Sequence, residues 1–253
     1  MIKNKMKEKL LAGQPAMGVS VMIPSPQIVE MLGKLGFDWV LIDGEHGALS
    51  PESMELMIMA AEASGATPIV RPESSAPEAI LKALDRGAMG IQAPHVNTAG
   101  EARRVVQAAR YHPLGSRGLA AGTRAGNYGF GLSLSDYCNQ ANRETLVCIQ
   151  LEEVEALRNL DEILSVEGVD VFFIGPSDLS QSMGYPGRTD APEVQTAMTA
   201  AFTAIASAGK LPGSAGNAQA VKGYLDKGCL YVYTHLTRLL AGGSAEFMRA
   251  VGT

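Results

Sequence analysis

The sequence is poor in cysteine, in long apolar runs and in excess basic charge. Its three cysteines, Cys138, Cys148 and Cys229, lie far apart and have neither metal-site nor redox spacing, so we expect reduced thiols. No stretch reaches the roughly 18 consecutive apolar residues of a membrane-spanning helix. The formal net charge of −5 offers no attraction to a phosphate backbone or an anionic lipid surface. We therefore expect neither nucleic acid nor membrane as a partner.

The remaining composition is typical of a folded enzyme. Of 253 residues, 46% are hydrophobic and 19% are charged, and there is no low-complexity block. The first residues, MIKNKMKEKLLAG, predict a charged amphipathic helix rather than the apolar core of a signal peptide. We expect a cytoplasmic protein with a single domain over residues 1–253, although the length alone is also compatible with two smaller domains.

Short apolar runs alternate with longer segments of helical periodicity, which is typical of repeated β/α units around a parallel sheet. The expected strands are Met17 to Met22, Trp39 to Asp43, Pro68 to Arg71, Gly90 to Ala93, Leu146 to Leu151, Val169 to Gly175, Leu211 to Ala215 and Cys229 to Tyr233. Eight such units in a chain of this length favour an α/β fold of the (β/α)8 TIM-barrel type. An open, doubly wound sheet shows the same alternation and is the structural alternative.

In such barrels the active site lies at the C-terminal ends of the strands. Glu152 and Asp178 follow the fifth and sixth expected strands, one β/α unit apart. Two carboxylates, completed by water and a bidentate substrate, suit a hard divalent ion such as Mg²⁺ or Mn²⁺. Each carboxylate could instead cap the helix that follows it. The presence of both, with Gln150 beside them, favours the metal site.

A histidine and an arginine occupy two further strand ends. His46 follows Asp43 and Glu45, and imidazole is the natural acid–base group near neutral pH. A hydrogen bond to a loop carbonyl is its structural alternative. Arg71 ends an otherwise apolar strand, where a buried guanidinium needs a partner. That partner is either a substrate oxygen or a carboxylate such as Glu45, and both contacts are compatible.

The lysines bear on the mechanism. All of them lie in expected helices or on the N-terminal side of strands, so none is placed to form a Schiff base. Stabilisation of a carbanion would then require a metal ion acting as a Lewis acid. The glycine-rich stretch from Gly115 to Gly131 follows a helix rather than a strand, which argues against a dinucleotide site. It belongs to a long loop from His112 to Gly131, which we expect to be a lid or a contact surface.

Four stretches resemble the HpcH/HpaI aldolase family. They are GFDWVLIDGEHGALS (36–50), PIVRP (68–72), ARYHPLGSRGLA (109–120) and IQLEEVEALRNLDEILSVEGVDVFFIGPSDLSQSMGYPG (149–187). The resemblance implies a class II pyruvate aldolase, which reversibly cleaves a 4-hydroxy-2-oxo acid to pyruvate and an aldehyde through a metal-stabilised enolate. Its substrates would be hydroxy-oxo-heptanedioate or a 2-keto-3-deoxy sugar acid.

The resemblance also implies roles for individual residues. Glu152 and Asp178 would ligate a divalent ion, Mg²⁺, Mn²⁺ or Co²⁺, which pyruvate chelates. His46 would be the acid–base residue, steered by Asp85, and Arg71 would stabilise the enolate oxygen.

The pyruvate carboxylate would be bordered by Gln150 and by the turn formed by Gly175, Pro176 and Ser177. The family further implies a homo-hexamer, a trimer of dimers with exchanged C-terminal helices.

Two segments depart from the motifs usual in this family. They are YVYTHLTRLL (231–240), in place of a Val-Gly-Ser-Asp type of turn, and GSAGNAQA (213–220), in place of Gly-Ile-Leu-Ala. Because these turns shape the mouth of the barrel, the departure concerns the aldehyde partner. Related enolate chemistry, such as oxaloacetate decarboxylation, is one alternative to aldol cleavage, since it needs only the metal and the arginine. The altered turn after the eighth strand suggests a second alternative, a barrel that binds a 2-oxo acid without turnover, but the presence of His46, Arg71, Glu152 and Asp178 argues against it.

Overall fold

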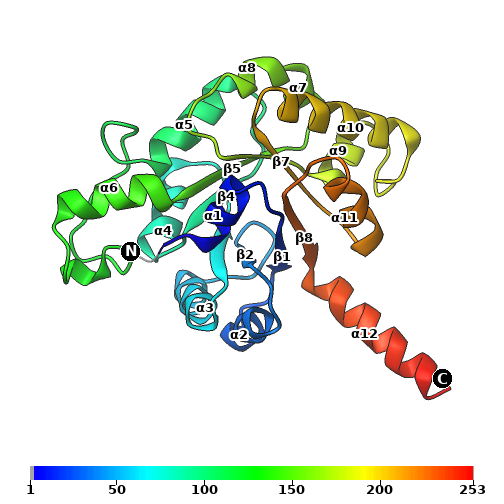
Figure 1. Ribbon diagram of the computed structural model, residues 1–253, viewed down its shortest axis with the longest axis horizontal. Coiled ribbons are helices and arrows are strands. Elements are labelled where there is room, and N and C mark those ends of the chain that lie inside the picture. Colours follow the sequence, from blue (N-terminus) through cyan, green and yellow to red (C-terminus); the bar gives the residue numbers. More distant parts are fainter. Residues whose placement is uncertain (1–2, 253) are drawn as a thin grey trace.

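The computed structural model, which describes residues 3–252, is a closed barrel of eight parallel strands in sequence order (Figure 1). The strands are β1 (Ala16–Val21), β2 (Trp39–Asp43), β3 (Thr67–Arg71), β4 (Gly90–Ala93), β5 (Leu146–Leu151), β6 (Val171–Ile174), β7 (Leu211–Ala215) and β8 (Tyr231–His235). β1 pairs with β8, so the sheet closes. The predicted TIM barrel is confirmed, and the open sheet is excluded.

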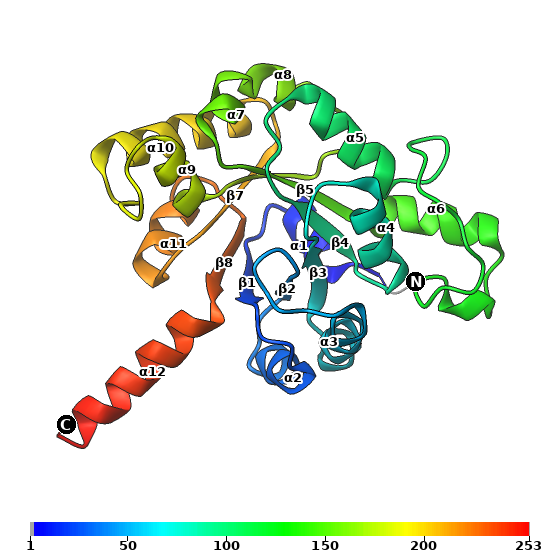
Figure 2. The same ribbon diagram turned by 180° about the vertical axis from the view of Figure 1, so that it is seen from behind.

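Helices follow the strands and surround the barrel (Figures 1 and 2). They are α1 (Lys5–Leu11), α2 (Pro26–Lys34), α3 (Pro51–Ser64), α4 (Pro77–Asp85), α5 (Ala99–Ala109), α6 (Leu134–Glu144), α7 (Val154–Arg158), α8 (Leu160–Leu164), α9 (Pro176–Ser182), α10 (Pro192–Ser207), α11 (Ala218–Leu225) and α12 (Leu236–Ala250), with a 3₁₀ turn η1 at Asn127–Gly129. None of the helices within residues 3–252 has both the length and the apolar composition needed to cross a bilayer.

The predicted bounds hold for β2, β4, β5 and β7. They differ by one or two residues at the ends of β1, β3 and β6, and they are wrong at both ends for β8. That strand begins at Tyr231 and ends at His235, two residues later than predicted. Cys229 belongs instead to the preceding turn, because its N–H bonds to the carbonyl of Tyr224, and pairing with β1 starts at Tyr231. The shift places His235 at a strand end.

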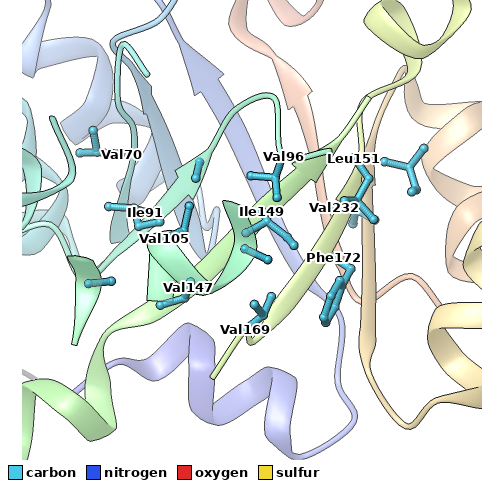
Figure 3. Close-up of a cluster of buried hydrophobic side chains, with 14 of the residues drawn as sticks. Val70, Ile91, Val96, Val105, Val147, Ile149, Leu151, Val169, Phe172 and Val232 are labelled. Atoms are coloured by element: carbon cyan, nitrogen blue, oxygen red, sulfur yellow. The ribbon is translucent and has the colours of Figure 1, made fainter. Parts of the chain in front are cut away.

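Strict alternation along the strands divides the core into two layers, because successive strand side chains point to opposite faces. One set, which includes Trp39, Leu41, Phe173 and Tyr231, fills the barrel interior. The other set lies between strands and helices, and Figure 3 shows part of it, including Val147, Ile149, Leu151, Phe172 and Val232. The alternation therefore fixes which strand-end residues point inward.

The two ends of the barrel differ. Met6 and Leu10 of α1 pack with the interior residues, so α1 covers the end where the strands begin (Figure 1). The opposite end, where the strands finish, is the mouth. Beyond β8, α12 runs away from the barrel with only Leu236 buried among its described residues, and Leu240 and Phe247 are exposed (Figures 1 and 2).

Candidate active site

The inward-facing register continues into polar residues at the mouth. On β2, Asp43 follows Trp39 and Leu41 on the same face, and on β5, Gln150 follows Cys148. Asp43, Arg71, Gln150 and Glu152 are all buried. β2, β3 and β5 are therefore apolar toward their beginnings and carry polar residues toward their ends, which places hydrogen-bonding and charged groups at one rim.

These residues line a cavity of about 170 Å³ at the mouth. Its walls are formed by His46, Arg71, Gln150, Glu152, Phe173, Gly175, Pro176, Ser177, Asp178, Thr189, Ala215, Gly216, Asn217, Ala220, Tyr224, Tyr233, His235 and Arg238. The cavity thus receives residues from the ends of most strands, as expected for the active site of a barrel enzyme.

Arg71 is held by carboxylates on β2 and the loop after it. Its Nε donates to Asp43 Oδ1 at 2.9 Å, and its Nη2 forms a second, short contact with the same carboxylate. Nη1 lies 3.2 Å from Glu45 Oε2 and donates to Gln150 Oε1 at 3.4 Å. Burial opposes the charge, but these carboxylates outweigh it and raise the pKa of Arg71, so the guanidinium stays charged. The predicted ion pair with Glu45 is present.

Glu152 is buried, and both of its carboxylate oxygens accept hydrogen bonds. The backbone N–H of His95 donates to Oε1 at 2.9 Å, and Gln150 Nε2 donates to Oε2 at 2.6 Å. Neither Glu152 nor Asp178 makes a side-chain capping hydrogen bond at the start of α7 or α9 in the described chain. Asp178 does lie in the first turn of α9, where a negative charge suits the helix dipole, so only Glu152 has no role at a helix start.

Glycine at position 175 lets the backbone after β6 come close to this carboxylate. A Cβ atom there would come within 2.6 Å of Glu152 Oε2, closer than atoms approach without displacement. Burial raises the pKa of Glu152, and the nearby charge of Asp178 raises it further. Two carboxylates that line one cavity fit a hard divalent cation. Among residues 3–252 no group of three or more acidic, histidine or cysteine side chains is placed to hold a metal. The protein ligands of a cation at this site would therefore be the carboxylates of Glu152 and Asp178.

His95 joins the two acidic parts of the rim. Its Nε2 lies 3.2 Å from Glu45 Oε1, and its Nδ1 lies 3.4 Å from Glu152 Oε1 and 3.2 Å from Glu153 Oε1. Burial opposes protonation, but Glu152, Glu153 and Glu45 outweigh it and raise the pKa of His95. His95 adopts a positive φ of 52°, which directs its backbone N–H and its ring toward the same cluster.

The sequence matches the family model described as HpcH/HpaI aldolase/citrate lyase over residues 17–233. The chain belongs to this family. Relatives include the 4-hydroxy-2-oxo-heptane-1,7-dioate aldolase of Shigella flexneri, 39% identical, and that of Klebsiella pneumoniae, 40% identical. Each alignment covers 98% of this chain and 93% or 94% of the relative.

Solved structures agree with this assignment. A family member from Burkholderia cenocepacia J2315 superposes with a TM-score of 0.93 at 28% identity, covering 99% of this chain and all (100%) of that one. The citrate synthase SbnG superposes with a TM-score of 0.85 at 30% identity and covers 98% of both chains. The fold of this chain is therefore that of the HpcH/HpaI barrel, and the resemblance found in the sequence is confirmed.

The structure brings all but one of the predicted site residues to the cavity. His46, Arg71, Gln150, Glu152, Gly175, Pro176, Ser177 and Asp178 line it. Asp85 does not. It ends α4, toward the end of the barrel where β4 begins, and its Oδ1 pairs with Arg117 Nη2 at 2.7 Å. Within one chain Asp85 therefore has no contact with His46, and the steering role stays a prediction that a single copy of this HpcH/HpaI chain does not support.

Asp43 occupies the position beside His46 instead. Its Oδ1 accepts the backbone N–H groups of Glu45 and His46 at 3.1 and 3.2 Å, in addition to the Arg71 contacts. The His46 ring is half-exposed, with Nε2 3.8 Å from Glu45 Oε2. Asp43 thus fixes the loop from which both Glu45 and His46 reach the cavity.

The predicted site did not include His95, which contacts Glu45 and Glu152, nor His235 and Arg238, which are among the other residues that line the cavity. His95 follows β4, and its contacts with Glu45 and Glu152 join three separate loops. His235 was missed because the predicted strand ended at Tyr233, two residues before the observed end of β8. Its place at a strand end is the signal that would have revealed it.

Proposed function

We propose that this chain is a divalent-cation-dependent pyruvate aldolase, which reversibly cleaves a 4-hydroxy-2-oxo acid to pyruvate and an aldehyde. One observation carries the proposal: a single cavity joins the carboxylates of Glu152 and Asp178 to the buried, charged guanidinium of Arg71. Among the described residues that line this cavity there is no lysine, so a Schiff-base route has no amine at this site. The dioate aldolases that align over nearly the full chain support the same reaction.

Glu152 and Asp178 are the residues that would hold the cation, and Mg²⁺, Mn²⁺ and Co²⁺ suit two carboxylates and a chelating 2-oxo acid. The family is in general dependent on a divalent metal. When bound, such an ion acts as a Lewis acid that draws electron density from the substrate carbonyl. Gln150 positions Glu152 through the 2.6 Å hydrogen bond, so we assign Gln150 to orienting this carboxylate as well as to bordering the substrate.

Arg71 is assigned to the oxygen that becomes negative as pyruvate turns into its enolate. Asp43 fixes two nitrogens of the guanidinium, and the third, Nη1, reaches toward Glu45 and Gln150 at the cavity. A fixed, charged donor that costs no reorganisation stabilises the transition state more than the ground state. The ion pairs and the substrate contact thus coexist, because the pairs hold the guanidinium in place.

His46 is assigned to the proton of the substrate's 4-hydroxyl group. Its ring lines the cavity from a loop and remains half-exposed, so it can exchange protons with solvent. Cleavage of the carbon–carbon bond requires removal of that proton as the aldehyde leaves, and an imidazole suits the transfer near neutral pH. The reverse reaction returns the proton to the aldehyde oxygen.

Replacing Arg71 by alanine is expected to lower kcat for aldol cleavage about 10²- to 10³-fold, the size of effect found when one oxyanion donor is removed. KM should change much less, because the contact strengthens in the transition state. The decisive readout is exchange of the pyruvate methyl protons with deuterated solvent, followed by NMR without aldehyde. Exchange and cleavage should slow together.

Arg71→Lys serves as the conservative comparison. It keeps a charge but loses the planar fork that holds Asp43, so we expect partial recovery of the rate. If methyl exchange in Arg71→Ala proceeds at the wild-type rate while cleavage fails, Arg71 acts on the aldehyde half and the enolate assignment is wrong.

A second enzymatic function uses the same residues. The similarity to the citrate synthase SbnG at 30% identity favours considering other reactions of a 2-oxo acid enolate, such as decarboxylation of oxaloacetate. A panel of 4-hydroxy-2-oxo acids assayed beside oxaloacetate, with pyruvate release as the signal, separates the two. Faster turnover of oxaloacetate than of every aldol substrate would favour the decarboxylase, and no turnover of any would favour a binding protein.

We also propose a cytoplasmic homo-hexamer, a trimer of dimers with α12 exchanged between copies. The support is the course of α12 away from the barrel and its exposed apolar residues Leu239, Leu240 and Phe247 (Figure 1). A single helix with an uncovered apolar stripe gains stability by packing on another surface. A monomeric mass in analytical ultracentrifugation would contradict this assembly.

A further inference from the structure

Two polar side chains lie inside the barrel, below the cavity. Gln92 of β4 and Tyr231 of β8 are both fully buried, and the Tyr231 ring packs against the apolar interior residues Trp39 and Phe173. Neither is among the described residues that line the cavity. An amide or a hydroxyl inside an apolar core costs free energy unless it is hydrogen-bonded, so the partners of these two groups indicate their role.

Gln92 and Tyr231 belong to a series of hydrogen bonds that ends at Glu152. The Tyr231 hydroxyl donates to Gln92 Oε1 at 2.9 Å, across the interior between two opposite strands of the barrel. Gln92 Nε2 donates in turn to Gln150 Oε1 through a short contact, and Gln150 Nε2 donates to Glu152 Oε2 at 2.6 Å. The interior of the barrel is therefore connected to a carboxylate that we assign to the cation.

The series has one direction, because each amide has donors at one end and an acceptor at the other. The Glu152 carboxylate accepts, so Gln150 turns its Nε2 toward it and its Oε1 toward Gln92. Gln92 must then present its own Nε2, which leaves its Oε1 in need of a donor, and Tyr231 supplies that donor. Each of these bonds is thus made in a single orientation of the two amides.

Gln92 is the closer of two donors to the carbonyl oxygen of Gln150. The other is Arg71 Nη1, which lies 3.4 Å away, a long distance for a hydrogen bond, and Arg71 is also engaged by two carboxylates. The position of the Gln150 amide therefore depends on Gln92. The orientation of the Glu152 carboxylate depends in turn on Gln150, through the bond to Oε2.

We propose that Gln92 and Tyr231 are positioning residues for the cation site. They hold the Gln150 amide, and through it the Glu152 carboxylate, in the orientation that binds the ion. The proposal rests on the divalent-cation-dependent function proposed above and extends it to two residues that line no part of the cavity. Loss of a hydrogen-bonded partner behind a metal ligand typically weakens metal affinity about 10- to 100-fold. Because Gln92 lies one bond further from the ion than Gln150, we expect the lower end of this range.

The test measures Mn²⁺ affinity by calorimetry on the metal-free protein, without substrate. Gln92→Met keeps a long, unbranched side chain and removes both hydrogen bonds, so we expect its Kd to rise about 10-fold. Tyr231→Phe removes one bond at a greater distance, and a rise of about 2- to 5-fold is expected, within the range for one neutral hydrogen bond. The double variant should bind no more weakly than Gln92→Met alone, because Tyr231 acts through Gln92.

Tyr111→Phe is the matched control for the loss of a buried hydroxyl. Tyr111 is buried, and its hydroxyl donates to the Tyr137 hydroxyl at 3.4 Å in an apolar cluster separate from the barrel interior. Tyr111→Phe and Tyr231→Phe should both lower the temperature of thermal unfolding, since each removes a buried hydrogen bond. Only Tyr231→Phe should weaken Mn²⁺ binding, which separates a positioning role from a contribution to stability.

The proposal is overturned if Gln92→Met binds Mn²⁺ within about 2-fold of the unmodified protein, whatever its stability, because the loss of one hydrogen bond should exceed that. If Gln92→Met does not fold, Tyr231→Phe decides, and affinity equal to that of Tyr111→Phe refutes the positioning role. Additive losses in the double variant would also contradict it, since Tyr231 would then not act through Gln92. Absence of Mn²⁺ binding by the unmodified protein would instead refute the cation site and the proposed function themselves.

Discussion

Replacing Glu152 by glutamine is expected to abolish turnover that depends on a divalent cation. Glutamine keeps the shape of the side chain but removes the negative charge, which leaves Asp178 as the one anionic ligand among the described residues at the cavity. With half of the protein's ligand charge gone, Mn²⁺ binding followed by calorimetry should weaken strongly, and pyruvate release should fall to background. Asp178→Asn should behave in the same way.

Glu155→Gln is the matched control for this variant. Glu155 lies three residues further along the chain, in the first turn of α7, and is exposed. It should retain both Mn²⁺ binding and turnover. If Glu152→Gln keeps Mn²⁺ affinity and activity near those of Glu155→Gln, Glu152 does not ligate the cation, and the assignment of the metal site is wrong.

Replacing His46 by alanine is expected to reduce kcat for aldol cleavage by about 10²- to 10⁴-fold, the usual contribution of a general acid–base group. Metal affinity should stay nearly intact, because the contacts of the His46 ring are with Glu45 rather than with Glu152 or Asp178. Steady-state cleavage and Mn²⁺ binding, measured on the same sample, separate the two effects.

His112→Ala is a suitable comparison, since His112 is exposed and follows α5 at the far side of the barrel from the mouth. Its kcat should equal that of the unmodified protein. If His46→Ala loses the metal together with activity, His46 is a ligand and its acid–base role must be abandoned.

The barrel could be predicted because most of its strands have a recognisable local sequence pattern. The runs that became β2, β4, β5 and β7 are apolar and bounded by glycine, proline, charge or polar residues, so their limits were correct. β8 was wrong because Cys229 and Leu230 are as apolar as a strand, whereas the turn that contains them is fixed by a hydrogen bond from Cys229 to Tyr224. That bond is a local contact at the end of α11, and Gly228, with a φ of 82°, is the signal in the sequence that the strand prediction did not use.

The site could be predicted where a residue sits at a strand end, as Arg71 and Glu152 do, because parallel strands bring their C-terminal ends together. His95 was missed because its importance comes from contacts with Glu45 and Glu152, which are distant in sequence. Asp85 was carried over by resemblance alone. Its place at the end of α4 follows from the length of that helix, which carries the chain back to the opposite end of the barrel.

The most direct test of the account is exchange of the pyruvate methyl protons in deuterated solvent, catalysed by the intact protein without any aldehyde. The account predicts rapid exchange with Mg²⁺ or Mn²⁺, complete loss with a chelator, recovery when the cation is restored, and no covalent adduct after borohydride treatment with pyruvate. Exchange that persists in the chelator, accompanied by a borohydride-trapped adduct on a lysine, would contradict it.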